Sequence, residues 1–101
     1  MSSPVRRLAV GIEYDGTQYA GWQHQPGLQT IQDCVQKALS AVADHPVTVT
    51  AAGRTDAGVH ACAQVVHFDT TASRPVRGWV LGANGHLPPE IAINWAMEVE
   101  P

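Results

Sequence analysis

The residues from Gly53 to His60, Gly-Arg-Thr-Asp-Ala-Gly-Val-His, hold the densest group of chemically active side chains in this sequence. Arg54 and Asp56 are two apart, so in an extended segment they point the same way, and a guanidinium beside a carboxylate lowers its pKa. An ionised Asp56 can act as a nucleophile or as a base. The same spacing also fits a surface turn in which Asp56 caps the backbone and pairs with Arg54, while Gly53 and Gly58 permit the bend.

Hydrophobic periodicity predicts the elements that position this segment. Apolar side chains alternate over four stretches and recur at helical spacing over two, and Thr30 and Asp33 have the spacing of a variant capping box at the first helix. The most regular alternation is that of the last strand. The expected strands cover residues 8–14, 47–52, 64–70 and 91–99, and the expected helices cover 30–44 and 75–84.

The order strand, helix, strand, strand, helix, strand is that of an α+β, ferredoxin-like βαββαβ sandwich. Right-handed crossovers place both helices on one face of an antiparallel sheet and leave the other face open. The Gly53–His60 segment then connects the second strand to the third. This fold hosts many unrelated functions, so the architecture alone selects none of them.

Composition narrows the class of protein. A length of 101 residues, 45% of them hydrophobic, fits one compact domain, and a formal charge of -3 gives no overall positive field. Cys34 and Cys62 lie far apart and outside any C-x-x-C pattern, so we expect buried thiols and neither a disulfide nor a metal site. No run reaches the ~18 apolar residues of a membrane span, and we expect a cytoplasmic protein that does not contact a membrane.

The Gly53–His60 segment, extended to Ala61 as GRTDAGVHA, resembles the catalytic loop of the TruA-type tRNA pseudouridine synthases. Further parts of the chain resemble the same family in the same order. They are IEYDGTQYAGWQHQ (first strand and loop), TIQDCVQKAL (first helix), QVVHFDT (third strand) and LGANGHLPPEIAI (closing helix, loop and strand).

The resemblance implies isomerisation of uridine to pseudouridine in the anticodon stem-loop of tRNA, at positions 38 to 40, without cofactor or metal. Asp56 falls on the catalytic aspartate of the family. It would act as a nucleophile or remove a ribose proton to give a glycal, and the sequence does not choose between the two. Arg54 would keep Asp56 ionised and contact the RNA. Gly53, Thr55, Gly58 and His60 are expected to shape the loop.

A second segment, Tyr19 to Gln25, has two aromatic and three polar side chains, a composition suited to contacts with RNA bases. Trp22 fits equally a stacking role and a place in the core. For Gln23 and His24 we favour contact with RNA. Many family members have arginine at the position of His24, so this sequence departs from the family pattern there.

The family chain is much longer, so residues 1–101 are expected to form its N-terminal catalytic-loop domain, inactive by itself and part of a homodimer in the complete enzyme. Its second half would supply the tyrosine that stacks on the target uracil. Two alternatives remain open. One is a noncatalytic ferredoxin-like RNA-binding or interaction domain, although QVVHFDT lacks the aromatic pattern of an RNA-recognition motif. The other is a small hydrolase of the same fold.

Overall fold

The computed structural model describes residues 4–15, 26–27, 30–55 and 62–100, with the backbone alone at 52–55, 62 and 63. Six elements follow one another in the predicted order. They are β1 (Arg6–Tyr14), α1 (Ile31–Ala43), β2 (Thr50–Thr55), β3 (Cys62–Thr70), α2 (Val76–Asn84) and β4 (Ile91–Val99). The predicted α+β, ferredoxin-like fold is confirmed. Neither of these two helices is long and apolar enough to cross a membrane.

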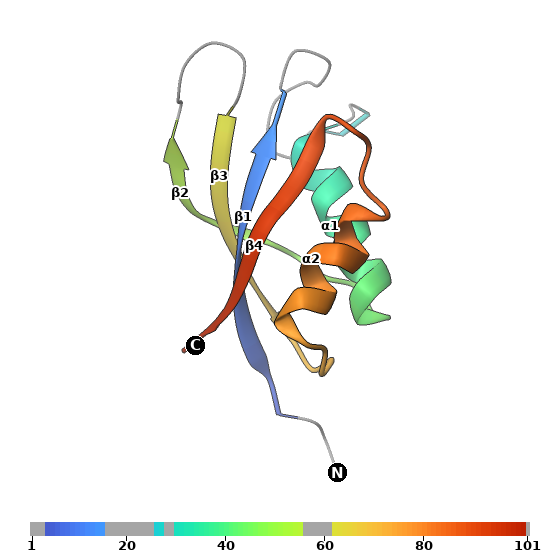
Figure 1. The fold of residues 1–101 in the computed structure, drawn as a ribbon, viewed down its shortest axis with the longest axis vertical. Helices are drawn as coiled ribbons and strands as arrows, with labels where there is room; N and C mark the ends of the chain where they lie inside the picture. Colours follow the sequence, from blue (N-terminus) through green and yellow to red (C-terminus); the bar gives the residue numbers. More distant parts are fainter. Residues whose placement is uncertain (1–3, 16–25, 28–29, 56–61, 101) are drawn as a thin grey trace.

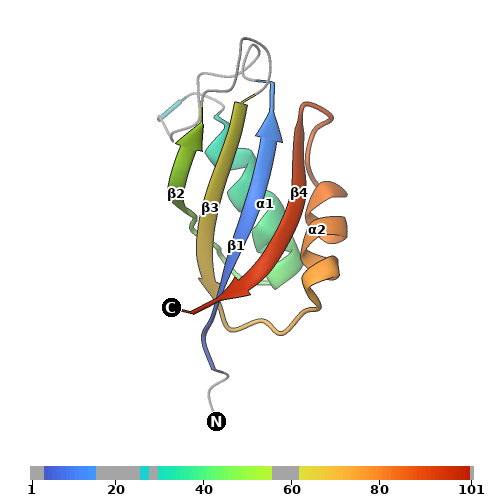
Figure 2. The same cartoon turned by 60° about the vertical axis from the view of Figure 1, so that its left-hand side comes forward.

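The four strands form one antiparallel sheet in the order β2-β3-β1-β4, with both helices on one of its faces (Figures 1 and 2). β1 and β2 finish at the same end of this sheet at which β3 and β4 begin, because all neighbours are antiparallel. We call this end the loop end. The opposite end holds the start of β1 and the finish of β3, where Arg6 pairs with Thr70.

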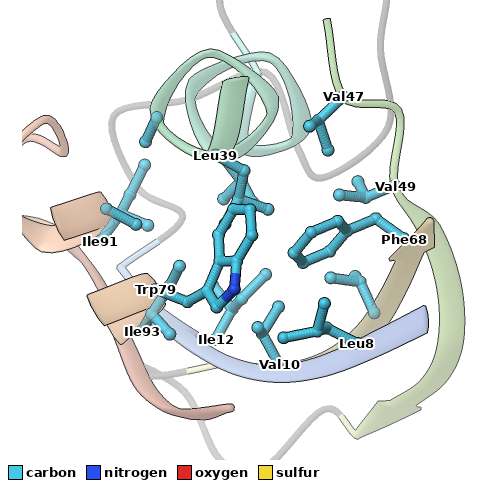
Figure 3. Close-up of a cluster of buried hydrophobic side chains, with 14 of the residues drawn as sticks. Leu8, Val10, Ile12, Leu39, Val47, Val49, Phe68, Trp79, Ile91 and Ile93 are labelled. Carbon is cyan, nitrogen blue, oxygen red and sulfur yellow. The ribbon is translucent and has the colours of Figure 1, made fainter. Parts of the chain in front are cut away.

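The core lies between the sheet and the two helices. Trp79 of α2 is 1% exposed, and its ring meets Phe68 of β3 edge to face at a centroid distance of 5.2 Å (Figure 3). Every second residue of β1 faces this layer. Burying such apolar surface is the main term that stabilises a domain of this size. The buried apolar residues of β1, β3 and β4 are Leu8, Val10, Ile12, Tyr14, Val66, Phe68, Ile91 and Ile93.

The first helix begins as its capping pattern predicts. The Thr30 side chain accepts a hydrogen bond from the Asp33 N–H at 3.3 Å, and its hydroxyl donates to Asp33 Oδ2 at 2.8 Å. These bonds use one of the N–H groups that a helix start leaves unpaired. The helix ends at Asp44, which adopts the left-handed conformation with φ 60°.

The second strand begins later than predicted and continues further. Val47 and Val49 are buried, but their N–H groups donate to Ser40 Oγ at 2.8 Å and to Gln36 Oε1 at 3.0 Å. Because side chains of α1 accept these bonds, the segment before Thr50 needs no neighbouring strand. β2 instead runs on to Thr55, so the first three residues of the GRTDAGVHA motif belong to the sheet.

The fourth strand contains a β-bulge that its regular alternation did not predict. Ile12 pairs with Ile93 and Gly11 with Trp95, which leaves Asn94 as an extra residue and changes which residues face the core. Trp95 and Met97 consequently lie on the open face, 40% and 52% exposed.

Two contacts support the bulge. Asn84 of α2 donates from Nδ2 to the Ile93 carbonyl at 3.0 Å and accepts from the Ile93 N–H at 2.8 Å, which fixes the backbone just before the extra residue. On the open face, the Trp95 indole occupies the space that a side chain at Gly11 would need.

Candidate active site at the loop end of the sheet

The loop end of the sheet brings together the segments that carry the predicted chemistry. Thr55, the last residue of β2, pairs with Ala63 of β3, and Tyr14, the last residue of β1, pairs with both Cys62 and Ile91. The connection that contains Asp56 therefore starts and finishes at this end, beside the end of β1 (Figure 1). The segment that contains Trp22 begins from the same place, after Tyr14. Positions 14 and 56 are 42 residues apart in the sequence, yet the segments that contain them both leave the sheet at its loop end.

Three of the predicted site residues lie in β2. Gly53 pairs with Val65, Arg54 with Gln64 and Thr55 with Ala63, so the sheet backbone holds the segment that leads to Asp56. The remaining predicted site residues are outside the part of the chain that the structure describes, and their roles stay predictions. They are Trp22, Gln23, His24, Asp56, Gly58 and His60.

Gln64 is a residue of this region that sequence reasoning missed. It is 2% exposed, and its Oε1 atom is buried without a hydrogen-bond partner. A buried polar atom left unpaired costs ~1–3 kcal/mol, so native proteins rarely keep one. The signal in the sequence is a polar residue two positions before Val66, in the row of β3 that Val66 and Phe68 continue.

A second unpaired buried atom lies at the same end. Glu90 Oε2 is buried and has no partner, and the Glu90 carbonyl accepts a hydrogen bond from the Asp15 N–H at 3.0 Å, directly beyond β1. Among the described side chains, these two atoms are the buried polar groups without partners. The loop end is thus the end at which the fold leaves polar groups unsatisfied.

The arginines near the opposite end are engaged within the chain. Arg7 donates from Nε and Nη2 to the two carboxylate oxygens of Asp69 at 2.7 and 3.1 Å, and this hydrogen bonding lowers the pKa of Asp69. Arg6 lies 3.8 Å from Glu98, and Arg74 donates to the Val42 carbonyl at 3.1 Å. These three cations have intrachain partners.

A cavity of about 540 Å³ lies beside the start of α1, lined by Asp33, Cys34 and Lys37 together with His86 and Leu87. Cys34 is partly buried and packs against the core, which agrees with a small apolar role. The structure describes the backbone but not the side chain of Cys62. No group of three or more metal-ligating side chains occurs in the described part of the chain.

Comparison with known proteins identifies the family of the chain, over a range that includes the GRTDAGVHA motif. A family model for tRNA pseudouridine synthase matches residues 11–101, and the chain belongs to that family. The resemblance inferred from the motifs is thereby confirmed.

Three curated relatives carry the name tRNA pseudouridine synthase A. The Coxiella burnetii (strain Dugway 5J108-111) protein is 65% identical over 96 residues, which cover 95% of this chain and 37% of the relative. The Vibrio cholerae serotype O1 (strain ATCC 39541 / Classical Ogawa 395 / O395) protein is 59% identical over 92% of this chain and 35% of the relative. The Acinetobacter baumannii (strain AYE) protein is 54% identical over 95% and 37%. The chain therefore spans little more than a third of the length of these relatives.

Proposed function

We propose that this chain forms the catalytic-loop domain of an enzyme that converts uridine to pseudouridine in tRNA, with Asp56 as the catalytic residue. The observation that carries the proposal is the strand pairing on both sides of the motif, Thr55 with Ala63 and Tyr14 with Cys62. This pairing gives the GRTDAGVHA segment a rigid support at one end of a sheet. Catalytic groups need such support because small displacements cost large factors in rate.

The reaction is an isomerisation. The bond from uracil N1 to ribose C1′ breaks, the uracil turns, and a bond from C5 to C1′ forms, while C5 loses a proton and N1 gains one. No oxidant or reductant is needed for this balance. The target base must leave the stack and enter a pocket closed to water. Asp56 would act there either as the nucleophile or as the base that gives a glycal.

The substrate that we propose is the anticodon stem-loop of tRNA, at positions 38 to 40. Arg54, Trp22, Gln23 and His24 are the residues that we propose for RNA contact, while Gly53, Thr55, Gly58 and His60 shape the loop. We further propose that the complete enzyme is a homodimer. A surface built partly from the rest of such an enzyme would reconcile RNA binding with the formal charge of -3 of this chain.

A chimera tests the proposal. Residues 1–101 are joined to the remainder of the C. burnetii relative, outside its 96 matched residues. The chimera is incubated with an unmodified tRNA transcript tritiated at uracil C5, because pseudouridine formation releases this hydrogen to water. We expect release by the chimera, none by its Asp56→Asn variant, and none by the 101-residue chain alone.

Two controls sharpen the result. A transcript with cytidine at positions 38 to 40 should lose the signal if the site is the one we propose, and release from it would place the target elsewhere in the tRNA. Turnover by the Asp56→Asn chimera would refute the catalytic role of Asp56. An inactive chimera that folds and binds the transcript would contradict the proposed activity of residues 1–101.

A further inference from the structure

The open face of the sheet carries apolar side chains that the described part of the chain leaves exposed. Trp95 and Met97 of β4 lie on this face, 40% and 52% exposed, while both helices lie on the other side of the sheet (Figure 2). An antiparallel sheet with one face in water normally has polar side chains on that face. Single exposed apolar residues are common, but neighbouring ones on paired strands indicate a contact surface.

The strand register shows that these residues belong to one continuous patch over three strands. Gly11 of β1 pairs with Val65 of β3 and with Trp95 of β4, and Ala9 pairs with Met97. Paired positions of antiparallel strands share a face. We call these five residues, Ala9, Gly11, Val65, Trp95 and Met97, the open-face patch. None of the five has an ionisable side chain.

The fold itself turns Trp95 toward this patch. An unbroken alternation from Ile91 and Ile93 would direct the side chain at position 95 into the helix layer. The bulge at Asn94 instead directs it to the open face, where the indole lies over Gly11. A large apolar ring that the fold turns away from its own core is free for a contact that the described chain does not make.

The charges around the patch argue against RNA as its partner. The two basic side chains beside the patch, Arg7 and His67, both interact with Asp69. Arg7 donates two hydrogen bonds to this carboxylate, and the charge of His67 lowers its pKa. The next charged side chain on this face is the carboxylate of Glu13. RNA binding depends on cations that neutralise phosphates, so this face is better suited to an apolar protein surface.

The relatives indicate where such a surface would come from. The chain matches the N-terminal portion of the C. burnetii protein and covers 37% of it, so nearly two thirds of that relative lies outside the matched residues. The family match extends to residue 101, just past the end of β4 at Val99. In such a relative, the next residues therefore continue from the strand that carries Trp95 and Met97. A segment joined in this way has an effective concentration of about a millimolar, which favours it over a second copy.

We propose that the open-face patch is the surface against which the remainder of the complete enzyme, the part that follows the matched residues in the relatives, packs on this domain. Trp95 is the centre of the contact, and the remainder presents apolar side chains to it. The inference rests on the family and on the length of its members. It does not depend on the catalytic role of Asp56, so a chimera without turnover still tests it.

Thiol labelling of the chimera described above tests the contact. Met97→Cys places a thiol in the patch. Leu81→Cys is the matched control, because Leu81 is 60% exposed on α2, on the other side of the sheet. A covered thiol reacts only through local opening, so we expect maleimide labelling at position 97 to be at least about tenfold slower than at position 81. Mass spectrometry reads each site separately, and equal rates at the two positions would overturn the proposal.

A photoreactive side chain identifies what covers the patch. The chimera with p-benzoylphenylalanine in place of Met97 is irradiated as an equal mixture of unlabelled and heavy-isotope-labelled protein, with and without the tRNA transcript. We expect cross-links to the relative's part of the same chain, which never combine the two isotopes. Cross-links that combine them would show a second copy on the patch, and cross-links to the transcript alone would show RNA there. Either of these results would overturn the proposal.

Discussion

The two ends of the sheet differ in whether their buried polar side chains have hydrogen-bond partners. At the opposite end, the buried Thr70 bonds to His45 and Ala72, and on the surface Arg7 holds Asp69 with two hydrogen bonds. At the loop end, Gln64 Oε1 is buried without a partner. The same strand, β3, runs through both environments.

This difference indicates a division of work along the sheet. Groups that are fully paired stabilise the folded chain whether or not a ligand is present, whereas an unpaired buried group is a cost that persists where function needs it. The opposite end then contributes stability, and the loop end supports the segment with Asp56. Substitutions at the opposite end should accordingly affect the stability of the chain, and substitutions at the loop end should affect turnover.

Asp56→Ala should give the largest effect and the clearest test of this division. In the chimera we expect pseudouridine formation to fall below detection, because under the proposed function the carboxylate takes part in the bond changes at C1′. The melting temperature of the 101-residue chain should hardly move, since the sequence predicts Asp56 in a surface loop between two strands and surface substitutions usually change stability by no more than ~0.5 kcal/mol. Retained tritium release together with a large loss of stability would contradict the assignment of turnover to the loop end and of stability to the opposite end.

Thr70→Val should lower the stability of the chain and leave turnover unchanged, the reverse of the effect expected for Asp56→Ala. The variant leaves the Ala72 N–H and His45 Nε2 without their partner, so we expect a loss of about 2 kcal/mol in the free energy of unfolding. Urea denaturation of the 101-residue chain measures it. Turnover of the chimera should stay at the wild-type level, and a loss of turnover with unchanged stability would contradict the division.

Gly11→Ala tests the bulge that lies between the two ends. A Cβ at this position would overlap the Trp95 indole, so the ring must move away from the open face of the sheet. We expect this to lower the free energy of unfolding by about 1 kcal/mol. In a Trp95→Ala background the same substitution should cost much less, because the obstructing ring is gone. Equal costs in both backgrounds, measured by urea denaturation, would show that the indole does not lie over Gly11 in solution.

The smallest expected effect is the pH dependence of the Arg7–Asp69 pair. Arg7 lowers the folded-state pKa of Asp69, so the pair stabilises the chain above the ordinary aspartate pKa of ~3.9 and loses this contribution as the pH falls through the lower folded value. Asp69→Asn should therefore be slightly less stable than the wild type at pH 7, and the difference should vanish in acid. Salt should weaken it, because both groups are at the surface. A difference that grows as the pH falls would contradict this sign.

Local signals in the sequence were sufficient for the order of the elements and for the start of α1. The Thr30 cap with Asp33 and the apolar stripe of the helix depend on residues three and four apart, and these lie next to each other in any helix. The strand with Leu8, Val10 and Ile12 was predictable for the same reason, because a period of two needs no knowledge of the neighbours. The GRTDAGVHA motif likewise indicated the family without a structure, and the family match confirms it.

The tertiary structure decided where pairing begins, which face a side chain takes and which polar groups find partners. β2 starts only at Thr50 because Ser40 and Gln36, on a separate helix, accept the N–H bonds of the two valines before it. Trp95 lies on the open face because a bulge beside Gly11 shifts the alternation by one residue. Gln64 and Thr70 are both buried polar residues of β3, and the contacts around each of them leave Gln64 Oε1 unpaired and Thr70 Oγ1 bonded. Each of these outcomes depends on contacts between residues far apart in the chain, which no local period encodes.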